Sequence, residues 1–201
     1  MVDPAAGPAT TAGAGAGSRT VWRPVAVLVA VMWVVALLDL LVPWDAPDSG
    51  VVSRTWTGLL AVPLMPFLHA DLAHLVANTV PLVVLGLLVS WRAGRAFWPV
   101  VATVAIGSGL GVWLVGASDT VTIGASGLVF GLLAYLLTAG LLTRHWVDVL
   151  VAALVLVLYG GVLGGALPFG VPAGVSWLAH LCGLVAGVVA AVLFVDRPRG
   201  G

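Results

Sequence analysis

Residues 123–142 read IGASGLVFGLLAYLLTAGLL, an almost wholly apolar run with one serine, Ser126, among the small residues at its start. A helix rises about 1.5 Å per residue, so an apolar segment over 124–142 can cross a hydrocarbon core about 30 Å thick. No charged residue interrupts this run. The stretch therefore predicts a membrane-spanning helix that begins at a polar side chain.

Further apolar runs occur along the whole chain. Its 201 residues are 61% hydrophobic and only 8% charged, and they include neither lysine nor glutamate, a composition that excludes an ordinary soluble fold. The runs are also too long for the strands of a membrane β-barrel. We therefore expect an all-α, polytopic membrane protein, a bundle of six transmembrane helices at about 21–42, 70–90, 97–117, 124–142, 147–163 and 175–195.

The two ends of the chain differ from this membrane domain, which we place at 19–197. Residues 1–18 contain almost no bulky apolar side chains and predict a disordered tail, and 198–201 form a second, short tail. Seven of the eight arginines lie in the tails or in the second and fourth connections, and only Arg54 lies on the opposite side. The positive-inside rule then predicts that both termini are cytoplasmic. We expect a plasma membrane, and the abundance of Ala, Gly, Val and Arg points to a bacterium.

Four polar side chains fall at similar depths near the outer ends of three predicted helices. His74 and Asn78 are four residues apart, so they lie on one helix face. His180 lies about 8 Å from the outer end of the last helix, and Ser126 joins the same layer if the connection before it dips inward. A serine beside glycine can simply bond a backbone carbonyl, but an imidazole among apolar neighbours needs a partner. Intramembrane polar groups at one depth therefore suggest a functional site.

Glycine spacing suggests how two of these groups meet. Gly127 and Gly131 form one face of small residues, and Gly183 and Gly187 form another. Such faces let two helices approach closely. Close packing would bring Ser126 and His180, each just before one of these faces, within the ~3 Å needed for proton transfer. His69, at the end of the first outer connection, is expected to hold that connection onto the second helix.

Together these motifs resemble those of the rhomboid family of intramembrane serine proteases. The matching residues are Gly124-Ala125-Ser126-Gly127, His69 followed by His74-x-x-x-Asn78, and Ala179-His180-x-x-Gly183-x-x-x-Gly187. The resemblance implies that Ser126 is the nucleophile and His180 the general base. It also implies that the Ala125–Ser126 backbone and the side chains of His74 and Asn78 stabilise the oxyanion.

Two departures from the family pattern are visible. Family members often have tyrosine four residues after the serine, packed on the catalytic histidine, whereas this chain has Phe130. The first outer connection, 43–69, is short and lacks the Trp-Arg pair of many members; Arg54 and Trp56 are an approximate counterpart. The stacking ring is therefore expected to remain, while its hydroxyl is lost.

The expected function is that of a serine endopeptidase acting on transmembrane segments of other proteins within the lipid bilayer. No cofactor and no nucleic acid are expected. A haem or metal site is not expected either, because His69 and His74 are five residues apart and the single cysteine, Cys182, points to another side of its helix than His180. Two alternatives remain open: a non-catalytic rhomboid-like protein that binds transmembrane helices, and a small transporter lined by His74, Asn78 and His180. The oligomeric state is left open.

Overall fold

The computed structural model describes residues 20–41, 49–169, 171–172 and 174–195. Both predicted tails, 1–18 and 198–201, lie outside the described residues. Within the described part, long helices occupy each of the six predicted segments, which confirms the all-α, polytopic architecture. These helices are α1 (Trp22–Leu41), α3 (Leu72–Ala93), α4 (Phe97–Val115), α5 (Ser126–Thr143), α6 (Trp146–Tyr159) and α7 (Trp177–Phe194).

Length and hydropathy alone give five membrane-crossing runs among the described residues. The 3-10 turn η3 (Gly94–Ala96) joins α3 to α4, so Leu72–Val115 counts as one run of 44 residues. The 3-10 helix η4 (Gly160–Ala166) likewise extends α6. Helix α6 is short by itself. Together with η4 it forms the run Trp146–Ala166, 21 residues in all, which is enough to cross the hydrocarbon core.

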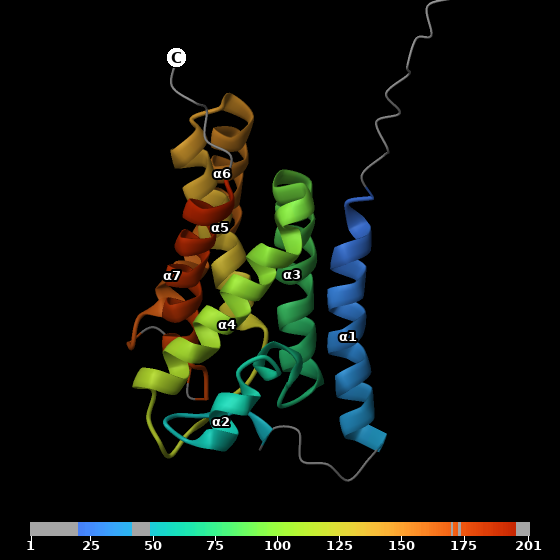
Figure 1. Ribbon diagram of the computed structural model, residues 1–201, viewed down its shortest axis with the longest axis vertical. Helices are drawn as coiled ribbons and strands as arrows, with labels where there is room; N and C mark the ends of the chain where they lie inside the picture. The colour runs from blue at the N-terminus through green and yellow to red at the C-terminus, as the bar shows by residue number, and fades with distance from the viewer. Residues whose placement is uncertain (1–19, 42–48, 170, 173, 196–201) are drawn as a thin grey trace, which may run out of the picture.

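Helix α5 is the centre of the bundle. Most of its residues are buried, and it packs against α3, α4, α6 and, most extensively, α7. Helix α1 stands at the edge and packs mainly on α3 (Figure 1). The chain segment before α5 climbs back into the bundle after the end of α4, so α5 begins well inside the molecule (Figure 1). The inward dip required to bring Ser126 level with the other polar residues is therefore present.

The connection between α1 and α3 contains structure that the helix pattern did not predict. It includes β1 (Val51–Val52), the short helix α2 (Trp56–Ala61) and the 3-10 helix η2 (Met65–Phe67). Strand β1 pairs antiparallel with β2 (Val121–Thr122), and Val51 lies opposite Thr122 in this pair. This small sheet joins the connection before α3 to the connection before α5, and so links the two segments that lead into the polar layer.

Polar contacts join the helices at the other end of the bundle. Arg92, in the last turn of α3, forms an ion pair with Asp148 of α6, with 2.6 Å between Nε and Oδ1. The Thr143 hydroxyl of α5 donates to the second carboxylate oxygen of Asp148 at 2.8 Å. A carboxylate removed from water needs a cationic partner or hydrogen bonds of this kind. Helices α3, α5 and α6 are thus fastened together at the end opposite the polar layer.

Candidate active site

Gly124 places the start of α5 against α3. Its φ of +108° is a conformation that L side chains rarely adopt. A Cβ at this position would lie 2.7 Å from the ring of His74 and 3.7 Å from Nδ2 of Asn78. The Gly124 N–H donates to the carbonyl of Met65 at 2.9 Å. Glycine is therefore required here, and its backbone lies directly on the His74 and Asn78 side chains.

Ser126 is the first residue of α5 and is half-buried. The first N–H groups of a helix have no acceptor within the helix and form its positive end. Because α5 begins inside the bundle (Figure 1), these donors lie in the polar layer beside Gly124. Ala125, the residue before Ser126, is 1% exposed, so the turn that presents the serine is fixed by packing.

The predicted contact between the two glycine faces is present. A Cβ at Gly183 of α7 would overlap the carbonyl oxygen of Gly127, and one at Gly187 would overlap the carbonyl oxygen of Gly131. At the end of the interface nearest Ser126, a Cβ at Gly127 would lie 3.1 Å from the carbonyl oxygen of Ala179. The neighbours of Ser126 and His180 in the chain are thus in direct contact, as small residues at a helix crossing allow.

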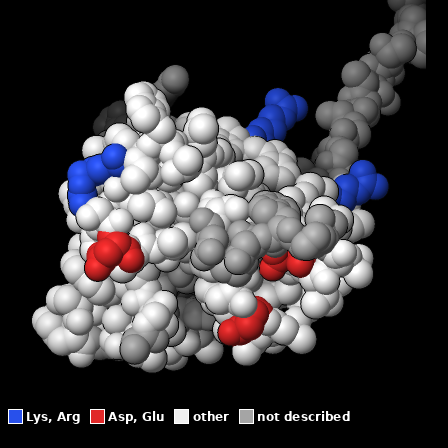
Figure 2. Space-filling model, turned by 90° about the horizontal axis from the view of Figure 1, so that it is seen from below, with Lys and Arg blue, Asp and Glu red and all other residues white. Residues whose placement is uncertain are grey.

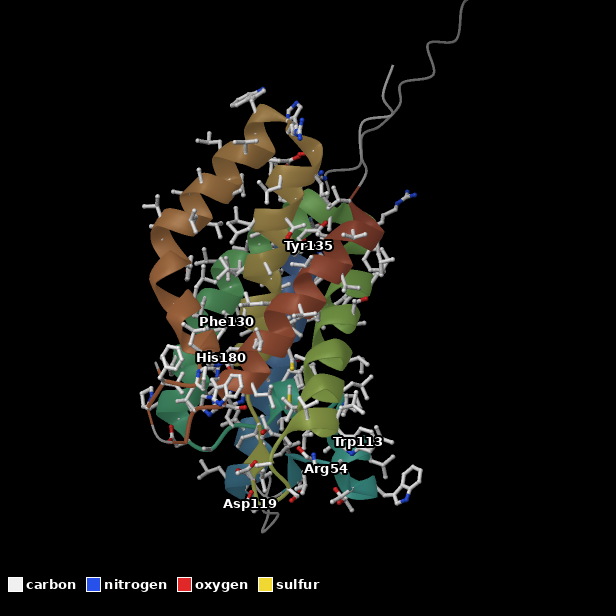
Figure 3. The ribbon with its side chains drawn as sticks, turned by 90° about the vertical axis from the view of Figure 1, so that its left-hand side faces the viewer. Arg54, Trp113, Asp119, Phe130, Tyr135 and His180 are labelled. Carbon is white, nitrogen blue, oxygen red and sulfur yellow. The ribbon has the colours of Figure 1, made fainter. Side chains whose placement is uncertain are left out.

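His180 is held on two sides. It is buried in the first turn of α7, after the N-cap Ser176, and its Nδ1 lies 2.9 Å from the carbonyl oxygen of Gly165 in η4. One ring face stacks on Phe130 of α5, with centroids 4.1 Å apart and planes 5° from parallel. Figure 3 shows the two residues next to each other near the lower end of the bundle. The expected packing of a Phe130 ring on this histidine is therefore observed.

His69 and His74 form a second aromatic pair. Their ring centroids are 5.0 Å apart in an edge-to-face arrangement, and the His69 Nδ1 lies 3.3 Å from the carbonyl oxygen of Phe67. Burial, and secondarily the charge of His74, lower the pKa of His69 from 6.5 to about 4. His69 therefore packs as a neutral ring against His74 and attaches the end of the first connection to α3.

Two local hydrogen bonds hold the start of α3 in place. The carboxylate of Asp71, the N-cap, accepts from the His74 N–H at 2.7 Å. The Asn78 amide nitrogen donates to the His74 carbonyl at 3.1 Å. The first is a helix N-cap bond, and the second joins a side chain to the carbonyl one turn earlier in the same helix. The His74 ring and the Asn78 carboxamide both remain on the side that meets Gly124.

The structure thus brings Gly124, His74 and Asn78 into one contact and packs the turn of Ser126 on the turn of His180. Among the described residues, however, the Ser126 hydroxyl forms no hydrogen bond with the His180 ring. Catalytic hydrogen bonds are often long in ligand-free sites and tighten when substrate binds. The described residues contain no group of three or more His, Cys, Asp or Glu that could hold a metal ion.

Two contributors to this region were not predicted. The Gly165 carbonyl holds His180, yet a backbone acceptor has no signal in the sequence. The Trp that fastens the first connection is Trp113 of α4, whose indole N–H donates to the Thr55 carbonyl at 2.7 Å. Trp56 instead is 81% exposed. Arg54 donates from its guanidinium to the Gly116 carbonyl at 2.8 Å, and Figure 3 shows it close to Trp113 at the end of α4.

Comparison with known proteins agrees with this architecture. Residues 53–197 match the model of the Rhomboid domain. An uncharacterized protein of Mycobacterium tuberculosis is 43% identical over 177 residues, which are 85% of this chain and 74% of the relative. An uncharacterized protein of Mycobacterium leprae is 41% identical over 176 residues, 85% of this chain and 70% of the relative. The matched domain includes every residue of the polar layer described above.

Proposed function

Because the chain belongs to the rhomboid family, we propose that it is a serine endopeptidase that cleaves transmembrane segments of other membrane proteins inside the bilayer. The observation that carries this proposal is the contact of Gly127 with Ala179, which sets the turn of Ser126 against the turn of His180. The imidazole is buried and oriented on two sides. A hydroxyl beside an oriented base is the arrangement that activates a nucleophile.

In the proposed reaction, His180 accepts the proton of the Ser126 hydroxyl as its oxygen attacks the carbonyl carbon of the substrate. The same proton then passes to the leaving amine as the peptide bond breaks, which leaves an acyl group on Ser126. Attack by water, with His180 again as the base, releases the new carboxyl end and restores the serine. A serine and a histidine suffice for this sequence of proton transfers.

The negative charge on the reacting carbonyl oxygen needs hydrogen-bond donors. We assign this role to the N–H at Ser126, next to Ala125, and to the side chains of His74 and Asn78. Support comes from Gly124, two residues before the serine, which lies within contact of both side chains. The positive end of α5 adds to the stabilisation. Donors fixed in this way by packing need no rearrangement during the reaction.

The proposed substrate is a transmembrane segment that is unwound near its end. In a continuous helix each carbonyl is engaged in an internal hydrogen bond, so an intact helix hides the bond to be cut. Segments with small or helix-breaking residues are therefore favoured. The site lies within the first two turns of α3 and the first turn of α7, close to one end of the bundle.

We propose that this end faces away from the cytoplasm. Arg23, Arg92, Arg95 and Arg144 all lie toward the opposite end, where α1 begins and α3 and α5 end. On the proposed outer face, Figure 2 shows charged side chains that are few and separated, and Arg54 and Asp119 lie there (Figure 3). The positive-inside rule then places both termini in the cytoplasm of a bacterial cell.

The test combines labelling by a fluorophosphonate probe with cleavage of a model transmembrane substrate. Wild type, Ser126→Ala and His180→Ala are compared, with Ser90→Ala as the matched control, because the Ser90 hydroxyl donates to the carbonyl of Val21, just before α1, instead. We expect wild type and Ser90→Ala to be labelled and to cleave the substrate. Ser126→Ala and His180→Ala should do neither. A folded wild type silent in both assays would refute the proposal and favour helix binding or transport.

A further inference from the structure

His180 meets a backbone carbonyl where a soluble serine protease has a carboxylate. The Gly165 oxygen in η4 lies 2.9 Å from Nδ1, and no carboxylate of the described residues forms a hydrogen bond with this ring. Asp71 caps α3, and Asp148 pairs with Arg92. The third group at this site thus comes from the short 3-10 helix that follows α6.

A carbonyl oxygen can only accept a hydrogen bond, so the Nδ1 facing it must carry the proton. The neutral ring then has its lone pair on Nε2, the state that a general base requires. In serine proteases with three catalytic groups, an aspartate fixes the same tautomer and orientation. We infer that the Gly165 carbonyl is the positioning group for His180, an inference that rests on the proposed function.

The membrane setting explains why a carbonyl serves here. A buried carboxylate without a cationic partner is costly in a low-dielectric medium. A carbonyl orients the ring without adding a charge, although a neutral acceptor forms a weaker bond than an ionised one. Phe130 compensates by covering the ring face, at 4.1 Å between centroids. The histidine is therefore fixed by one hydrogen bond and one stacking contact.

The glycines of η4 differ in a way that supports this role. A Cβ at Gly165 would lie 3.3 Å from Cζ of Phe130 and 3.4 Å from Nδ1 of His180. A Cβ at Gly161 or Gly164 would meet nothing within 4 Å. The absence of a side chain thus matters at Gly165, where the backbone approaches both rings, and is not needed for packing at Gly161 or Gly164.

The tautomer can be measured directly on the full chain. Ring-15N-labelled histidine protein in lipid nanodiscs gives nitrogen chemical shifts that distinguish a protonated Nδ1 from a protonated Nε2, and His180→Asn identifies the relevant signals. We expect His180 to be protonated on Nδ1 when neutral. A proton on Nε2, or the mixed tautomers of a solvated ring, would overturn the inference. This measurement needs no enzymatic activity, so a failure of the Gly165 contact to fix the tautomer is distinguishable from a failure of the proposed protease function.

Alanine substitutions provide the kinetic test. Gly165→Ala should displace the carbonyl or the ring by a few tenths of an ångström, and small misplacements cost about tenfold to a hundredfold in rate. We expect kcat and fluorophosphonate labelling to fall together by about tenfold or more, with KM changed less than about twofold. Gly164→Ala and Gly161→Ala should stay near wild type. Equal losses in all three variants, or an unaffected Gly165→Ala, would contradict the inference.

Discussion

The imidazole of His180 lies flat on the phenyl ring of Phe130, with centroids 4.1 Å apart and planes 5° from parallel. Phe130 is 6% exposed and belongs to α5, the helix that begins with Ser126. The same rigid helix therefore carries the proposed nucleophile and the surface that orients the proposed base. Their relative placement is fixed within one element and does not depend on a mobile loop.

Replacing Phe130 by leucine should remove the flat surface and let the His180 ring tilt. We expect cleavage to fall by about tenfold or more, as for other small misplacements of a catalytic group, whereas Phe130→Tyr should retain the stack and most of the activity. Phe97→Leu is the matched control, because Phe97 is also buried but makes an edge-to-face contact with Trp98 and does not touch His180 in a ring stack. If Phe130→Leu and Phe97→Leu lost activity to the same extent, the stacking of Phe130 on His180 would have no particular role.

The glycine crossing should tolerate no added carbon. Gly183→Ala places a methyl group on the carbonyl of Gly127, and overpacking of this kind costs about 1–3 kcal/mol. We expect a lower melting temperature together with a loss of activity, because the separation of α5 and α7 sets the distance from Ser126 to His180. Gly161→Ala, where space is open, is the control. An unchanged melting temperature of Gly183→Ala would disprove the close contact.

The success of the helix predictions has a simple physical cause. In lipid, a long apolar run can satisfy its backbone groups only as a helix, so the six segments allowed one interpretation. Gly127 and Gly183 were also informative, because small residues at fixed spacing mark a close crossing. The dip before Ser126 entered the sequence analysis only as the condition for a serine level with His180, because the apolar pattern does not predict it.

The elements that escaped prediction are those without a periodic pattern. Strands of two residues, such as Val51–Val52, and the six-residue helix α2 are too short to produce one. The partner of the first connection is Trp113, 58 residues from Thr55 in the chain, while the nearer Trp56 is exposed. The Gly165 carbonyl is invisible in principle, because every residue has a carbonyl and only the fold determines which one reaches His180.

Asn78→Ala should impair cleavage without unfolding the protein. The Asn78 amide lies beside Gly124, and removing one oxyanion donor typically lowers kcat by about 10²–10³. KM should change little, because this bond strengthens only in the transition state. Thr79→Val is the control in the next position, since Thr79 faces α1 and accepts from the Trp33 indole at 3.1 Å. A normal kcat in Asn78→Ala would remove this residue from the oxyanion site.

His69 should make stability depend on pH. Burial and the charge of His74 lower its pKa from 6.5 to about 4, so between these values the unfolded chain binds a proton that the folded chain does not. The stability contributed by neutral His69 is complete above pH 6.5 and is lost as the pH falls toward 4. In His69→Phe, the melting temperature should fall less between about pH 7.5 and pH 5 than in wild type. Parallel curves for the two proteins would contradict this assignment.

Trp113 should matter more than Trp56, although Trp56 lies closer to Arg54 in the chain. Trp113→Phe removes the indole donor from the Thr55 carbonyl, a loss of about 1–2 kcal/mol for a partly buried bond. The connection that carries β1 and α2 is then held at the end of α4 by Arg54, whose backbone N–H donates to the Trp113 carbonyl at 3.0 Å, and by Ser53, whose hydroxyl donates to the Val112 carbonyl at 2.8 Å. Thermal unfolding should therefore occur at a lower temperature in Trp113→Phe, and limited proteolysis should cut the 49–71 segment faster.

Trp56→Phe should behave like wild type in both measurements, because the Trp56 side chain is 81% exposed. If Trp56→Phe were the more damaging change, the connection would be anchored by its own tryptophan, and the contact with α4 would be incidental.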